Sequence, residues 1–106
     1  MGMKIGTEVL VIDNSYITEK ETGDTGARLA RATYRSELDL DFYQQDEDEL
    51  NAVFTIVSKI YEIQHPYPWI RKQGTKLHVQ DIKSNKTNKI YQVPIKGLIS
   101  LDKYLS

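Results

Sequence analysis

Closely spaced carboxylates are the first residues of this chain that could do chemistry. Asp39 and Asp41 stand two apart in an alternating segment, so both would lie on one face of a strand, and the run Asp46–Glu49 adds four more acids. Such a pair could bind a divalent cation, but hard-cation sites usually take about six or more oxygens from a shaped loop. The sequence has no glycine-kinked calcium loop. We therefore expect residues 37–49 to be a solvated acidic segment without a metal.

His65 and His78 are the only histidines, and the chain has no cysteine. A zinc site would therefore need carboxylates as its further ligands. Catalysis by a base or a nucleophile would need a cleft that perturbs a pKa, or an activated serine, and no motif indicates either. We expect both histidines to be structural, and we predict no catalytic residue, no metal and no cofactor.

The most suggestive segment for binding is Tyr67-Pro68-Trp69-Ile70-Arg71-Lys72. Aromatic rings followed by cations are typical of proteins that stack single-stranded bases and contact phosphates. Aromatic grooves that bind proline-rich or arginine-bearing peptides use the same residue types. The competing interpretation is that Trp69 anchors the core, because large aromatic side chains are mostly buried. We expect Tyr67 to be the more exposed of the two rings, and take Tyr67, Trp69, Arg71 and Lys72 as candidate binding residues.

A second candidate surface comprises Lys83, Lys86 and Lys89, which cluster around the tip of a predicted hairpin. Lysines at such a position commonly protect a sheet edge or keep a loop soluble. Contact with phosphate is the alternative role.

The charge of the chain is segregated by halves. Residues 1–65 have six Lys and Arg against thirteen Asp and Glu, whereas residues 66–106 have eight against two, so a net charge of −1 hides about −7 and about +6. Such polarity either steers a charged partner or is neutralised inside the fold. It argues against strong non-specific binding to nucleic acid, since the acidic half repels phosphate.

Length and composition predict one globular domain over residues 1–106, with 40% apolar and 27% charged residues. No apolar run approaches the roughly 18 residues of a membrane span, and no signal-like segment opens the chain. With no cysteine for disulfides, we expect a cytoplasmic protein that does not use a membrane.

Period-two patterns predict a mostly β, antiparallel chain with at most one or two short helices. Val9 to Ile12 form a short apolar run rich in β-branched residues, and residues 76–82 and 89–94 alternate around a polar turn, as in a hairpin. Glycines at 23 and 26 predict a tight turn. The expected strands are 7–13, 36–43, 52–63, 76–82 and 89–94, with short ones at 69–72 and 98–101.

Residues 46–63 allow two interpretations. Their apolar positions fit one helical stripe, which predicts a helix at about 46–61 and an α+β chain. Six of the eleven residues from 53 to 63 are β-branched, which favours a strand. We favour a helical turn near 46–51 followed by a strand over 52–63.

The order of these elements resembles a small Src-homology-3-like barrel. Gly6 to Ile12, followed by the turn Gly23-Asp24-Thr25-Gly26, is similar to the KOW-type half-motif of that superfamily, although the spacing between strand and turn is longer here. The resemblance implies a small antiparallel barrel or curled sheet. It also implies a module that binds RNA or protein and has no chemistry of its own.

Together these features predict a small non-enzymatic module for protein–protein interaction, as an adaptor or inhibitor. An RNA- or DNA-binding module that uses the basic C-terminal half is the alternative, and a small enzyme is the third hypothesis.

Overall fold

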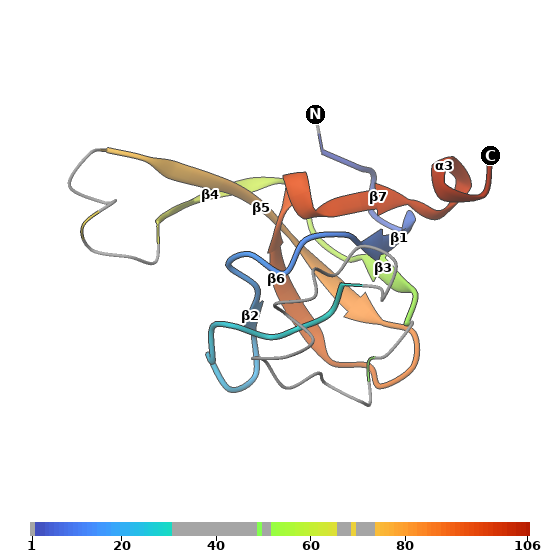
Figure 1. Cartoon of the computed structure of the whole chain (residues 1–106), viewed down its shortest axis with the longest axis horizontal. Coiled ribbons are helices and arrows are strands. Elements are labelled where there is room, and N and C mark those ends of the chain that lie inside the picture. Colours follow the sequence, from blue (N-terminus) through green and yellow to red (C-terminus); the bar gives the residue numbers. More distant parts are fainter. Residues whose placement is uncertain (1, 31–48, 50–51, 66–68, 70–73) are drawn as a thin grey trace.

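A computed structural model shows that the described residues form one antiparallel sheet of seven strands followed by a short helix (Figure 1). The structure describes residues 2–30, 49, 52–65, 69 and 74–106. The strands are β1 (Glu8–Val11), β2 (Thr18–Glu19), β3 (Phe54–Ile56), β4 (Tyr61–Gln64), β5 (Lys76–Ser84), β6 (Ile90–Pro94) and β7 (Leu98–Ser100). A 3₁₀ turn, η3 (Ile95–Gly97), separates β6 from β7, and the helix α3 (Leu101–Leu105) follows β7. The prediction of a mostly β, antiparallel chain is confirmed.

Strand β5 is the centre of the sheet because it pairs with three other strands. The order along the sheet is β2-β6-β5-β3-β1-β7, and β4 pairs with β5 off this path. On one side β5 pairs with β6 from Val79↔Pro94 to Lys83↔Ile90. On its other side the beginning of β5 pairs with β4 and its end pairs with β3. The predicted hairpin of residues 76–82 and 89–94 is therefore confirmed.

The predicted single strand over 52–63 is two strands separated by a bulge. Ile56 pairs with Ile82 and Tyr61 with Val79, so the four residues 57–60 face only two residues of β5. Ser58 fills the gap, because its Oγ accepts a hydrogen bond from the backbone amide of Asp81 at 2.8 Å. The alternative of a continuous helix at 46–61 is wrong for residues 54–61, where Phe54 to Ile56 and Tyr61 belong to strands and the buried Ile56 packs on the pleated sheet.

The core lies against one face of the sheet. Phe54 and Ile56 of β3, Ile82 of β5 and Tyr91 of β6 are fully buried. The rings of Phe54 and Tyr91 meet edge to face, with centroids 6.1 Å apart, a favoured aromatic geometry. Val9 and Val11 of β1 join the same cluster. The β-branched run that predicted the first strand thus supplies one wall of the core.

The sheet does not close into a barrel in the part of the chain that the structure describes. Closure requires the two outermost strands to pair with each other. Here β2 pairs with β6 and is only two residues long, while β7 pairs with β1. Of the expected barrel or curled sheet, the barrel is wrong, because the described strands form an open sheet. The two glycines of the turn predicted at 23–26 have positive φ angles of 75° and 113°, but the turn itself lies at residues 20–22, and Thr25 bridges to Thr18.

Several predicted elements fall partly or wholly outside the described residues. The strand at 36–43 lies entirely outside them, and the helical turn at 46–51 is described only at Glu49, which has 3₁₀ backbone geometry. Of the short strand predicted at 69–72, only Trp69 is described, and its backbone is helical. The closing strand is confirmed as β7, but Leu101 begins α3 because Ser100 caps the helix, its Oγ accepting from the amide of Lys103.

Candidate functional site

Trp69 and the lysines at 83, 86 and 89 lie toward opposite ends of β5. Trp69 belongs to the connection between β4 and β5, and its side chain is 63% exposed, so it is not a core anchor. Lys83, Lys86 and Lys89 surround the β5–β6 turn, with the first two exposed and the third half-buried. Nine residues of strand separate the two ends, which is on the order of 27 Å. Trp69 and these three lysines therefore do not form one surface. Tyr67, Arg71 and Lys72 lie outside the described residues.

The lysine-rich turn is organised by a buried carboxylate. Glu49 is 1% exposed and accepts hydrogen bonds from the hydroxyls of Ser84, at 2.6 Å, and Thr87, at 2.9 Å. The Ser84 Oγ in turn accepts from the backbone amides of Lys86 and Thr87, both at 3.1 Å. The expectation that residues 37–49 are solvated is therefore wrong at Glu49. This acid shapes a turn instead of facing solvent.

A groove of about 410 Å³ lies where β6 turns away from β5. Its apolar lining comes from both sides of that corner, and two lysines and a histidine complete it. The residues are Ile60, Leu77, Pro94, Ile95, Lys76, His78 and Lys96. The basic side chains therefore lie beside an apolar hollow. This arrangement suits a ligand with both apolar and acidic groups.

The groove exists because the β5–β6 ladder ends before β5 does. Pro94 is the last residue of β6 in the ladder, opposite Val79, and the next residue already belongs to η3. The chain then enters η3, while β4 pairs with the first residues of β5, namely Lys76, Leu77 and His78. Among the described residues these three have strand partners on their β4 side alone. One edge of β5 is thus left open beside η3.

Close packing fixes the position of η3, which forms the opposite wall of the groove. The Gly97 carbonyl accepts a hydrogen bond from the Ile12 amide at 2.8 Å, which ties η3 to the end of β1. A Cβ at Gly97 would meet the carbonyl oxygen of Asp13 at 3.1 Å, tighter than ordinary contact. The absence of a side chain at this position lets η3 lie close to the chain after β1.

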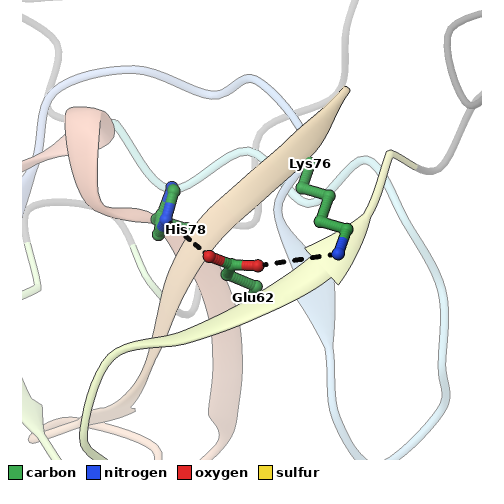
Figure 2. Close-up of polar contacts among 3 residues, drawn as sticks. All are labelled: Glu62, Lys76 and His78. Carbon is green, nitrogen blue, oxygen red and sulfur yellow. Dashed lines mark hydrogen bonds and ion pairs between the residues drawn. The ribbon is translucent and has the colours of Figure 1, made fainter. Parts of the chain in front are cut away.

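An exposed charge cluster lies on the β4–β5 pair at the edge of the groove (Figure 2). Glu62 stands directly across from His78 in the ladder, and its Oε1 lies 3.1 Å from the His78 Nε2. Its Oε2 lies 3.8 Å from the Nζ of Lys76. All three side chains are more than half exposed, so these pairs contribute little to stability and can exchange partners.

A hydrogen-bonded cluster holds β4 against the centre of the sheet. The Tyr61 hydroxyl donates to Asp81 Oδ1 at 2.6 Å and accepts from Gln92 Nε2 at 2.8 Å, joining β4, β5 and β6. Burial raises the pKa of Tyr61, and the hydrogen bond to the Asp81 carboxylate raises it further. Along β5 this cluster follows the residues that line the groove, and it keeps the open edge of β5 in place.

A second hollow of about 420 Å³ lies along the N-terminal segment and shares Ile60 with the groove, but it is more open to solvent. Gln80 forms one side of it, accepting from the Met3 amide and donating to the carbonyls of Met3 and Ser58. Within the described residues no three His, Asp or Glu side chains gather as a metal site. No helix described in the structure is long and apolar enough to cross a membrane.

The two histidines differ in their surroundings. His65 is 4% exposed and packs its ring edge to face against Tyr16, with centroids 4.4 Å apart. His78 is exposed and lines the groove. Sequence reasoning missed His78, Leu77, Ile95 and Lys96 as site residues. A signal was present, because the return strand of the hairpin ends at Pro94 and is too short to pair with the beginning of β5.

Comparison of the chain with protein-family models, curated proteins and solved structures finds no match. The groove and its charges are therefore the basis for the function proposed next.

Proposed function

We propose that this protein is a small non-enzymatic binding module whose partner is another protein, as an adaptor or an inhibitor. The observation that carries this proposal is the groove between β5 and η3, which combines an apolar lining with Lys76, His78 and Lys96. Protein interfaces pair a desolvated apolar centre with a polar rim in the same way. The binding residues of this proposal differ from the aromatic segment that the sequence suggested.

An RNA- or DNA-binding module is the alternative. It is favoured by the lysines at 83, 86 and 89, which lie around one ordered turn. Sites for single-stranded nucleic acid also need ring faces on which bases stack. The exposed Trp69 lies at the other end of β5, and His78 has the one aromatic ring among the described residues that line the groove. These positions support a protein partner over a nucleic acid.

The resemblance to Src-homology-3-like barrels remains a proposal and agrees with a binding role. Such modules bind RNA or protein, and one fold hosts many functions. The groove, not the fold, therefore supports the choice of partner.

Recovery of partners from source-cell extract tests the proposal. The tagged protein, Lys96→Glu and Ile95→Asp would each be used with and without nuclease. Leu105→Asp is the matched control, because Leu105 is 71% exposed on α3 and does not line the groove. We expect a protein that resists nuclease, is kept by the control and is lost by both groove variants. Recovery that disappears with nuclease, or that the groove variants leave unchanged, contradicts the proposal.

A further inference from the structure

We propose that the open edge of β5 at Lys76–His78 binds an acidic peptide segment in extended conformation, which adds to the sheet as a further strand in the groove. This inference rests on the proposed function and names the chemistry of the partner. It joins three observations: the direction of the backbone groups at this edge, the apolar lining and the charges around it.

Backbone groups of β5 alternate between its two sides, and three hydrogen bonds fix which residues face which side. Asp81 donates its amide to Ser58 and accepts at its carbonyl from Val57, both on the β3–β4 side. Ser84 donates its amide to the Lys89 carbonyl, on the β6 side. Even-numbered residues of β5 therefore direct their N–H and C=O toward β6. Because β6 ends at Pro94, the backbone N–H and C=O groups of His78 and Lys76 point into the open groove.

An unpaired strand edge of this kind is a template for an incoming strand. Each added residue pair in antiparallel geometry exchanges two hydrogen bonds, so His78 and Lys76 offer two donors and two acceptors. The three open residues span about 10 Å, enough for a short peptide segment. Nucleic acid has no backbone that matches this pattern, which is why we assign the site to a peptide.

The side chains of the groove specify what such a peptide carries. Successive residues of an extended peptide point to opposite faces, so one set can enter the lining formed by Ile60, Leu77 and Ile95 while the other stays at the rim. The groove volume of about 410 Å³ accommodates a few side chains of valine size. The peptide therefore alternates apolar and charged residues over this stretch.

The charges around the groove select an acidic segment. Lys76 and Lys96 line it, and the C-terminal half that forms most of it has an excess of about six positive charges. Glu62 is the one acid bound to this rim among the described residues, and it is not part of the groove lining. A carboxylate of the peptide can replace Glu62 as the partner of Lys76, because the existing 3.8 Å pair is exposed and weak.

A capped peptide of alternating glutamate and valine is the probe that tests this inference. We expect it to bind the full-length protein in calorimetry and to slow hydrogen exchange at the amides of His78 and Lys76, with Leu77 and Val79 unchanged because they face β4. The same peptide methylated on its backbone amides should bind at least about tenfold more weakly, since it cannot donate. A lysine–valine peptide should not bind.

Two charge variants and one control test the selection of acidic segments. Glu62→Gln frees Lys76 and His78, so it should bind the glutamate–valine peptide several-fold more tightly. Lys96→Glu should bind it about tenfold more weakly. Lys103→Glu makes the same charge change on α3, outside the groove, and should leave the affinity within about twofold.

Three binding results overturn the inference even when the glutamate–valine peptide binds. They are equal binding of the methylated and unmethylated peptides, protection of amides elsewhere in the chain, and an oligonucleotide of single-stranded thymidines that binds the groove more tightly than the peptide. If the glutamate–valine peptide fails but the groove variants still lose a protein partner from extract, strand addition is wrong and the proposed function stands. If the groove variants keep every partner, both strand addition and the proposed function are wrong.

Discussion

Tyr61 is the residue whose ionisation is most closely linked to the fold in the described part of the chain. Its hydroxyl joins three strands, donating to Asp81 and accepting from Gln92. Burial and the Asp81 carboxylate both favour the neutral phenol, so the pKa of Tyr61 in the folded protein is raised above the ordinary 10.0. Since the unfolded chain loses this proton first, stability contributed by the phenol is complete below pH 10 and declines as pH rises toward the folded pKa.

Tyr61→Phe should therefore cost about 1 kcal/mol near neutral pH, where a hydrogen bond to a charged group is lost. As the pH rises above 10, the difference from the parent protein should shrink, because the variant has no phenol to ionise. Urea unfolding of both proteins across this range measures the two free energies of unfolding. A difference that stays constant or widens with pH would show that the Tyr61 phenol is not protected by the fold.

Ser84 has a comparable role in the β5–β6 turn. Its hydroxyl donates to the buried Glu49 and accepts from two backbone amides. Ser84→Ala leaves these buried partners unsatisfied and should cost about 1–3 kcal/mol. Lys86→Ala, an exposed change in the same turn, should shift the free energy of unfolding by less than about 0.5 kcal/mol. Equal effects of the two substitutions in urea unfolding would mean that the Glu49 network does not hold the turn.

At the scale of elements, η3 determines whether the groove keeps its shape. Gly97→Ala brings a Cβ within 3.1 Å of the Asp13 carbonyl oxygen, and backbone atoms cannot swing away as a side chain can. The variant should lose about 1–3 kcal/mol of stability as η3 moves outward. It should also bind the glutamate–valine peptide more weakly. Unchanged stability and affinity would show that η3 tolerates displacement and is not a rigid wall.

The sequence predicted those elements whose pattern is local. Strands β1, β5 and β6 follow from β-branched or alternating residues next to turn residues, and such signals depend only on neighbours along the chain. The bulge after β3 could not be predicted, because it depends on Ser58 meeting Asp81 across the sheet. The β-branched residues at 55–57 lead directly into the bulge, so their pattern gives no sign that the strand ends there.

The site was predicted least well because its parts are distant in sequence. Glu49 stands in a run of four acids, and nothing local distinguishes the one that Ser84 and Thr87 bury. The groove joins residues near 60, 77 and 95, which the pairing of β4, β5 and β6 brings together. Only the early end of β6 at Pro94 was a local sign of the open edge.

For the whole molecule, the fold mixes the two oppositely charged halves of the sequence. Strands β1, β3 and β4 come from the acidic half, and β5, β6 and β7 from the basic half, yet β5 lies directly between partners from both. Glu62 pairs with Lys76 and His78 across one such contact. Within the described sheet, part of the segregated charge is thus neutralised between strands, and Lys76 and Lys96 add positive charge beside the groove.

This mixing predicts how the protein responds to nucleic acid and to salt. Each strand from the basic half lies beside a strand from the acidic half in the described sheet, so a single-stranded oligonucleotide should bind barely at all at physiological salt. Replacing Lys83, Lys86 and Lys89 together by alanine should leave the affinity for the glutamate–valine peptide unchanged, because these lysines lie at the far end of β5. Titrations of both ligands at several salt concentrations measure this. Tight oligonucleotide binding that weakens steeply with salt, and that the triple variant abolishes, would instead identify the turn as a nucleic-acid surface.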